Sequence, residues 1–183
     1  MPARARSCTV LFLLFLLPAA AQAQPKEKPK VRALTAFVRL DAAHYRQQVA
    51  DTLVMLRRAK SEFERTGYEV QTIRISTQPF PEYIRGMSHE QALAFFRDYD
   101  QLAQKEGFDA DIGPAMLHDS DDPAMAGLLA EVLAQSKVLN ASVVVAGDDG
   151  IHWHAVHAAA RVMKYLEEHT PHGQGNFNFT ATA

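Results

Sequence analysis

The residues best suited to acid–base chemistry form a histidine cluster near the C-terminus, at His152, His154 and His157. Imidazole changes charge near neutral pH, so we predict that His152 and His154 transfer protons. Imidazole and carboxylate also bind zinc, and the acidic run 147–150 precedes the cluster. The spacing matches neither HExxH nor a zinc-finger pattern, however, and a solvated helix start explains it better. We therefore predict no metal site.

Arg74 is the second candidate, because it alternates with two isoleucines in an expected strand. A guanidinium in a strand that is covered on at least one face must either be paired or face a ligand. Together with Thr77, it would hold a carboxylate or phosphate group by a two-pronged hydrogen bond. The alternative is a structural ion pair with Asp109 or Asp111, and the residues alone do not separate the two.

The predicted ligand site lies at the C-terminal ends of the strands, where open α/β sheets bind their ligands. Asp111 and Asn176 complete the ligand-binding set with Arg74 and Thr77. The acidic segment 118–122 lacks the EF-hand order, and we interpret it as a polar loop. No P-loop, GxGxxG motif or nucleophile elbow is present, so the sequence supports neither a nucleotide site nor a serine hydrolase. The cofactor, if any, is left open.

The elements that must position these residues alternate between short β-type runs and long helical ones. The β-type runs predict strands at 31–40, 68–76, 108–114, 141–147 and 176–183. Apolar residues at three- and four-residue steps predict helices at 43–66, 88–107, 122–133 and 152–168. Five strands separated by helices of crossover length predict an α/β fold with a largely parallel sheet.

The N-terminal segment predicts export. Arg4 and Arg6 precede an unbroken apolar run at 10–17, and Ala21-Gln22-Ala23 is a small-x-small cleavage site. The apolar run is shorter than the roughly 20 residues needed to span a bilayer. We therefore predict a signal peptide at 1–23, a linker at 24–30 and a domain at 31–183. The domain would be periplasmic or secreted and free of the membrane after cleavage.

The charge and the cysteine content of the chain limit which partners and which disulfides the exported domain can have. Of the 19 basic residues, two lie in the predicted signal peptide, so 17 remain against 21 acidic ones, a net charge of −4 with histidine neutral. This excess argues against nucleic acid and anionic membranes as partners. The single cysteine, Cys8, would also be removed by cleavage. The exported domain would therefore form no disulfide.

Four segments resemble the domain-of-unknown-function 711 family in order and spacing. They are GYEVQTIRISTQPFPEY (67–83), FDADIGP (108–114), ASVVVA (141–146) and GQGNFNFTATA (173–183). The resemblance implies a fold related to the ten-stranded α/β barrel of pyruvate formate-lyase, of which five strands would form half. It also implies that the chain corresponds to the N-terminal part of longer relatives. The family has no established reaction, and residues 24–183 lack the cysteine that glycyl-radical chemistry needs.

Two hypotheses follow for the function. The first is an exported α/β protein that binds or processes a small anionic ligand at the C-terminal ends of its strands. The second is a non-catalytic module, truncated relative to its family, that associates through its open sheet edge, for instance as a homodimer. Arg74 and His154 favour the first hypothesis, and the missing half of the barrel favours the second.

Overall fold

Five parallel strands form the central sheet of the protein, whose computed structural model describes residues 28–183. The predicted signal peptide and residues 24–27 of the predicted linker lie outside the described residues. The strands follow one another across the sheet in the order β1 (Val31–Val38), β2 (Val70–Thr77), β3 (Asp109–Pro114), β4 (Leu139–Val144) and β7 (Phe179–Thr182). All four pairings are parallel. The predicted α/β class is confirmed, and the arrangement is consistent with half a barrel.

Four helices connect successive strands: α1 (Tyr45–Arg65), α3 (His89–Glu106), α4 (Ala124–Gln135) and α5 (Trp153–His169). Four smaller elements were not predicted. The proline-rich segment after β2 contains a one-turn helix, α2 (Phe80–Tyr83), and β5 (Ala146–Gly147) pairs with β6 (Gly150–Ile151) in a small antiparallel hairpin. A 3-10 helix, η1 (Pro171–Asn178), occupies the start of the predicted last strand.

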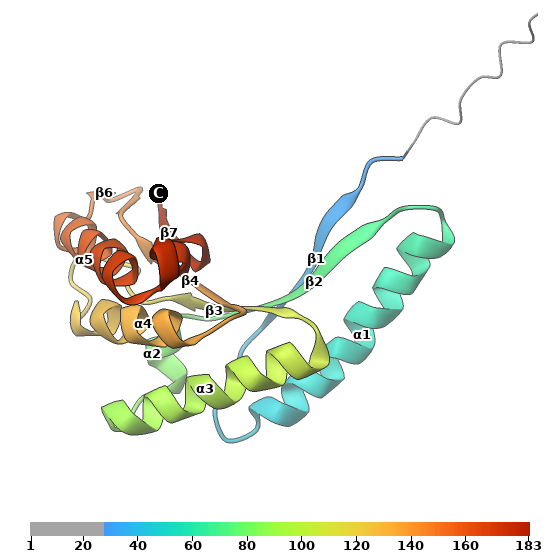
Figure 1. Ribbon diagram of the computed structural model, residues 1–183, viewed down its shortest axis with the longest axis horizontal. Coiled ribbons are helices and arrows are strands. Elements are labelled where there is room, and N and C mark those ends of the chain that lie inside the picture. Colours follow the sequence, from blue (N-terminus) through green and yellow to red (C-terminus); the bar gives the residue numbers. More distant parts are fainter. Residues whose placement is uncertain (1–27) are drawn as a thin grey trace, which may run out of the picture.

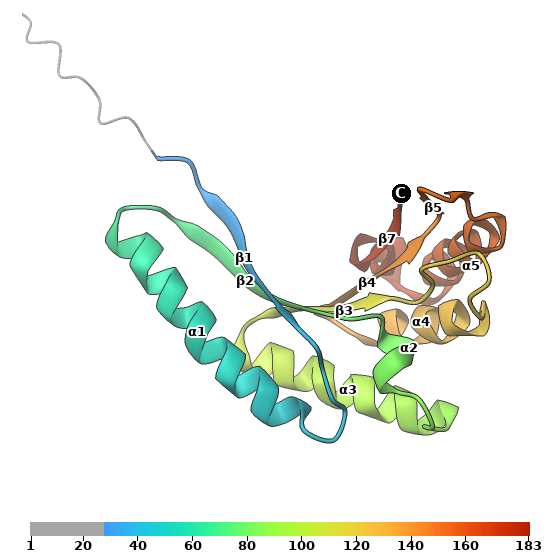
Figure 2. The ribbon, with the colours of Figure 1, turned by 180° about the vertical axis from the view of Figure 1, so that it is seen from behind.

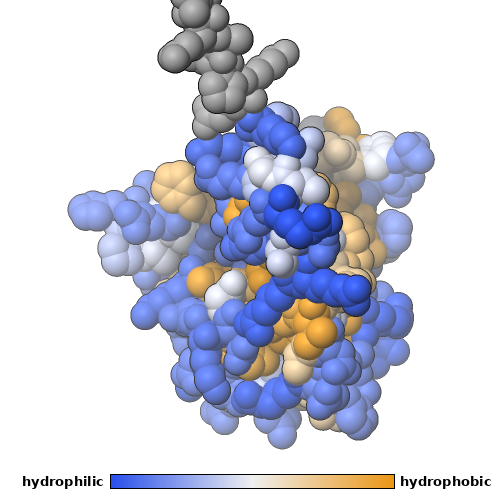
Figure 3. Space-filling view, turned by 90° about the vertical axis from the view of Figure 1, so that its right-hand side faces the viewer, coloured by the Kyte–Doolittle hydropathy of each residue, from blue (hydrophilic) through white to orange (hydrophobic). Residues whose placement is uncertain are grey.

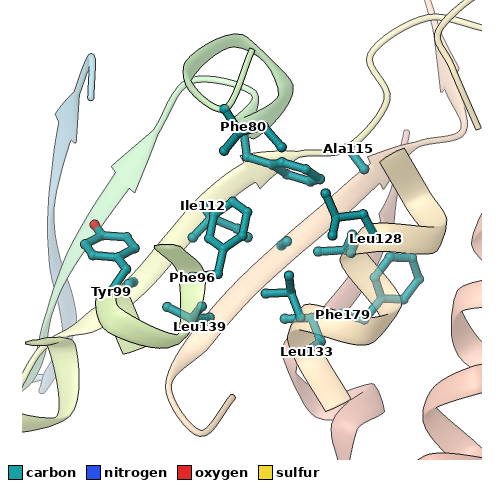
Figure 4. Close-up of a cluster of buried hydrophobic side chains, with 14 of the residues drawn as sticks. Phe80, Phe96, Tyr99, Ile112, Ala115, Leu128, Leu133, Leu139 and Phe179 are labelled. Atoms are coloured by element: carbon teal, nitrogen blue, oxygen red, sulfur yellow. The ribbon is translucent and has the colours of Figure 1, made fainter. Parts of the chain in front are cut away.

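The helices cover one face of the sheet, and the core lies between them and the strands (Figures 1 and 2). Alternate strand residues, such as Ile75, Ile112 and Val143, are completely buried in this core. Side chains from α2, α3 and α4 meet them, as Phe80, Phe96 and Leu133 show (Figure 4). Burying one stripe of each helix and one face of the sheet is the main stabilising term of the fold.

Local signals in the sequence fix several helix ends. Ser88 and Gln91 form the predicted capping box at the start of α3: the Ser88 hydroxyl accepts the Gln91 N–H at 3.2 Å, and the Gln91 side chain accepts the Ser88 N–H at 2.8 Å. Gly107 ends the helix in the left-handed conformation, at φ 71°. At α4, Pro123 rather than Asp122 occupies the cap position, although the Asp122 carboxylate accepts the Ala124 N–H at 2.9 Å.

The first β–α–β unit extends outward from the rest of the molecule (Figure 1). Strands β1 and β2 pair in register from Val31 to Val38, whereas β2 pairs with β3 only from Arg74 to Ser76. Seen from this end, the surface is mostly hydrophilic around a smaller hydrophobic patch (Figure 3). Among the described residues, no helix combines the length and apolarity needed to cross a bilayer.

Candidate functional site

The face of the sheet opposite the helices carries polar side chains; we call it the open face. Its polar residues alternate along each strand with those of the covered face: Thr35, Thr72, Arg74, Ser76, Asp109, Asp111, Asn140, Ser142 and Thr180. The open face also carries Phe37, the register partner of Ser76, and Ser76 itself is buried. Two hydrogen bonds cross this face between β2 and β3, from the Thr72 hydroxyl to Asp109 Oδ2 at 3.0 Å and from the Ser76 hydroxyl to Asp111 Oδ2 at 2.9 Å. The open face therefore brings hydroxyl, carboxylate and guanidinium groups together on neighbouring strands.

Arg74 lies on the open face with its guanidinium uncommitted. Its closest carboxylate oxygen is Asp109 Oδ2, which lies 3.8 Å from an Arg74 terminal nitrogen and is too far for a hydrogen bond. Within residues 28–183 the Arg74 Nε atom is buried and has no hydrogen-bond partner. The ion-pair alternative is present, with Asp109, but the pair is loose, and the guanidinium makes no hydrogen bond to residues 28–183.

Asp111 is held from two sides within the protein. Its Oδ2 atom accepts the Ser76 hydroxyl, and its Oδ1 atom accepts the backbone N–H of Gly113 at 3.1 Å. Gly113 has φ 77°, and a Cβ atom there would come within 2.3 Å of the Gln78 carbonyl oxygen. Only glycine fits this close approach of the two strand ends. The carboxylate of Asp111 is therefore fixed in place at the end of the open face.

Thr77 and Asn176 do not join this group. The Thr77 hydroxyl lies 3.3 Å from the Tyr83 hydroxyl, which in turn donates to the Ile112 carbonyl at 3.1 Å, so Thr77 points toward the covered face. Burial raises the pKa of Tyr83 well above its usual value. Asn176 lies in η1, before β7, and its amide donates to the Met163 carbonyl at 3.2 Å. Its position is therefore the amino end of the sheet, not the carboxyl end where we expected it.

His152 lies at the carboxyl end of the sheet, but both of its ring nitrogens already have partners. Nδ1 is 3.2 Å from the Val144 carbonyl oxygen, and Nε2 is 2.9 Å from Asp149 Oδ1. Two acceptors can be satisfied only by an imidazolium that carries both protons. The hydrogen bond to Asp149 accordingly raises the pKa of His152 and lowers that of Asp149. With a side chain only 4% exposed, His152 fastens the loop between β4 and α5.

His154 has a different setting, because only its Nδ1 atom is engaged. Asp119 Oδ2 lies 2.8 Å from Nδ1, and Asp119 Oδ1 accepts the backbone N–H groups of His154 and Ala155. Burial opposes ionisation of Asp119, but these hydrogen bonds outweigh it and lower the pKa of the carboxyl group. A carboxylate that orients a histidine through Nδ1 while Nε2 faces solvent is suited to proton transfer. The His154 side chain is 77% exposed.

A pocket of about 230 Å³ lies beside these histidines, between the segments that follow β2 and β3. His118 lines it, and the His118 ring centroid is 6.4 Å from that of His152. The three acidic residues that line the pocket already have partners: Asp121 accepts the backbone N–H groups of Leu117 and His118, Asp122 accepts that of Ala124, and Glu82 pairs with Arg39. The pocket thus offers a histidine and apolar walls rather than free carboxylates.

A metal site at the histidine cluster finds no support in residues 28–183, which contain no group of three or more potential ligands close enough to share an ion. His154 pairs with Asp119 from a distant loop instead of sharing an ion with His157. No feature of the sequence indicates this pairing, because residues 118–122 were interpreted as a polar loop and Asp119 lies 35 positions before His154. The hydrogen bond from Ser76 to Asp111 could not be foreseen from the sequence either, because it depends on strand register.

The fold and the open face define an α/β protein whose parallel sheet is covered by helices on one face and polar on the other. The family described as Uncharacterised ACR (DUF711) matches residues 24–183, and the chain belongs to this family. Residues 1–23, the predicted signal peptide, lie outside the matched range. No curated protein matches the chain.

Proposed function

We propose that the open face binds a small anionic ligand through the guanidinium of Arg74. The observation that carries this proposal is the lack of any hydrogen bond from Arg74 to the described residues, together with a buried Nε atom that has no partner. Buried polar groups in folded proteins are almost always hydrogen-bonded. A carboxylate or phosphate group would satisfy the guanidinium with two parallel, charge-assisted hydrogen bonds.

The surroundings of Arg74 support a ligand site rather than a purely structural ion pair. Parallel sheets usually have both faces covered, whereas among residues 28–183 no helix lies over the face that carries Arg74 (Figures 1 and 2). Hydroxyl groups of Thr35 and Thr72 lie on the neighbouring positions of β1 and β2. The polar open face would be the interior of a barrel related to that of pyruvate formate-lyase, and this relation is part of the proposal.

His154 is the proposed proton-transfer group, since its Nε2 atom faces solvent and Asp119 orients its ring. His152 takes a positioning role in this proposal, because both of its nitrogens bind protein acceptors. Export also belongs to the proposal. It rests on the composition of residues 1–23, which precede the range matched by the family.

The test of ligand binding compares two arginine variants of the full chain. Arg74→Met removes the guanidinium from the open face, and Arg58→Met removes an exposed one from α1, which packs on the other face. Phosphate, acetate and propionate are titrated into each protein by calorimetry or by NMR. We expect at least one of these anions to bind the wild type and Arg58→Met, and to bind Arg74→Met about tenfold more weakly. Equal affinities in all three proteins would refute the proposal.

The second candidate function is association through a sheet edge. Among the described strands, β1 and β7 each pair with a single neighbour, and Phe37 beside the β1 edge is 85% exposed. Unpaired strand edges readily pair with other chains. Sedimentation of the full chain would show a concentration-dependent dimer that Phe37→Lys weakens. Val54→Lys is the matched control, because Val54 is 71% exposed on α1 and not on a strand of the sheet. A monomer at all concentrations would exclude this function.

A further inference from the structure

The open face carries carboxylates as well as Arg74. On its described strands three side chains are charged: Arg74 on β2, and Asp109 and Asp111 on β3. A purely anionic ligand on Arg74 would therefore lie beside two carboxylates and be repelled by them. The charge pattern calls for a ligand whose own charges alternate in the same way.

The three charges lie within the span of one small molecule. Arg74 and Asp109 are register partners, and Ser76 and Asp111 are the partners two residues further along. Neighbouring strands are about 4.8 Å apart, and alternate residues of one strand are about 7 Å apart. A ligand of a few heavy atoms seated over Arg74 therefore reaches at least one of the two carboxylates.

Both carboxylates keep acceptor capacity for a cationic group. An ionised carboxylate offers about four lone-pair sites. Asp111 accepts two hydrogen bonds, from Ser76 and Gly113, and Asp109 accepts one, from Thr72. The Arg74–Asp109 contact, at 3.8 Å, is too long for a hydrogen bond, so it occupies neither a donor of Arg74 nor an acceptor site of Asp109. The site thus presents free donors and free acceptors side by side.

We infer that the ligand of the open face is a small zwitterion of the α-amino acid type. Its carboxylate binds the Arg74 guanidinium, and its ammonium group donates to Asp109 and Asp111. This inference rests on the proposed function, and it adds the second charge that the ligand must carry. Hydroxyl groups of Thr35, Thr72 and Ser76 border the same positions, and so does the exposed ring of Phe37.

The experiment titrates three probes of similar size into the full chain, followed by the backbone amide signals of β2 and β3. L-alanine carries both charges, propionate lacks the ammonium group, and L-alaninamide lacks the carboxylate. We expect L-alanine to bind about tenfold more tightly than either of the other probes. In Arg74→Met, L-alanine should bind only as tightly as L-alaninamide does.

A second variant separates the ammonium contact from the carboxylate contact. Asp109→Asn keeps an oxygen that can accept the Thr72 hydroxyl. It should weaken the binding of L-alanine, whereas propionate should bind as tightly as before or more tightly. Glu90→Gln, an equivalent change at an exposed position of α3, is the control. Propionate binding as tightly as L-alanine, with both dependent on Arg74, would overturn this inference and leave the proposed function standing. Binding that does not depend on Arg74 would overturn both. If none of the three probes binds, the inference is overturned, and the proposed function is overturned as well if phosphate and acetate also fail to bind.

Discussion

The two faces of the sheet use the same strands for opposite purposes. On the covered face, Ile75, Ala110 and Ile112 are completely buried against the helices. On the open face, one residue away in each strand, Arg74, Asp109 and Asp111 remain partly exposed. Stability thus comes from one face, and the chemical groups come from the other. The polar face can therefore hold a binding site, because the core does not depend on its side chains.

A cavity on the covered face should have the largest effect. Ile112→Ala removes most of a completely buried side chain, so we expect the free energy of unfolding to fall by about 2–5 kcal/mol. Chemical denaturation followed by circular dichroism measures this loss. Ile151→Ala is the control, because Ile151 is 57% exposed and should change stability by less than about 0.5 kcal/mol. Similar losses for the two variants would contradict the one-sided core.

The pair His152–Asp149, at the carboxyl end of the sheet, makes the stability of the fold depend on pH. The pKa of His152 is raised above its usual 6.5 by Asp149, so this pair stabilises the fold below pH 6.5. The stabilisation is lost as the pH rises through the raised pKa of the folded state. Asp149→Asn should flatten this decline, measured as the unfolding midpoint between about pH 6 and 9. Because Asp149 is 63% exposed, we expect a smaller effect than that of the cavity. An unchanged pH profile would show that the imidazolium is not held by Asp149.

A single hydrogen bond on the open face should matter less than the core. Ser76→Ala removes the donor to Asp111 Oδ2, and we expect it to lower the free energy of unfolding by about 1–2 kcal/mol. Ser120→Ala, at an exposed position of the loop before α4, provides the matched control. A loss as large as that of Ile112→Ala would mean that the open face is part of the stabilising core.

Arg74→Met should have the smallest effect on stability. The guanidinium makes no hydrogen bond to the described residues and only a long contact with Asp109, so we expect a change of less than about 0.5 kcal/mol. The same variant is expected to weaken anion binding, and this separation of binding from stability is the sharpest form of the comparison. A clear destabilisation would identify the ion pair with Asp109 as the main role of Arg74.

Much of the fold could be predicted because its signals are local. Alternating isoleucines mark β2, apolar residues at helical spacing mark α1, and Ser88 with Gln91 marks the start of α3. The last strand was predicted three residues too early, because Asn176 and Phe177 look β-like but belong to η1. Asn176 lies at the amino end of the sheet whether the last strand begins at 176 or at 179, so the error in the predicted site was to group it with residues of the carboxyl ends.

Residues of the site could be predicted only where their position in a strand determines which residues lie beside them. Arg74 and Asp111 lie on the neighbouring strands β2 and β3, and the pairing of consecutive strands can be expected from the sequence. The partners of the histidines could not be predicted, because Asp119 reaches His154 from the loop before α4, 35 positions earlier in the chain. Such a contact depends on how two loops fold over the sheet, and neither propensity nor spacing encodes it.

The uneven pairing of β2 has a further consequence for how the domain opens. Beyond Arg74 toward its amino end, β2 is held by β1 on one side only, while its carboxyl half lies between two strands. Amide hydrogens from Val70 to Ile73 should therefore exchange with solvent through local separation of the first unit, well before the amides of β3 and β4. The domain would then have a loosely attached arm and a firm centre, with Arg74 at the boundary between them.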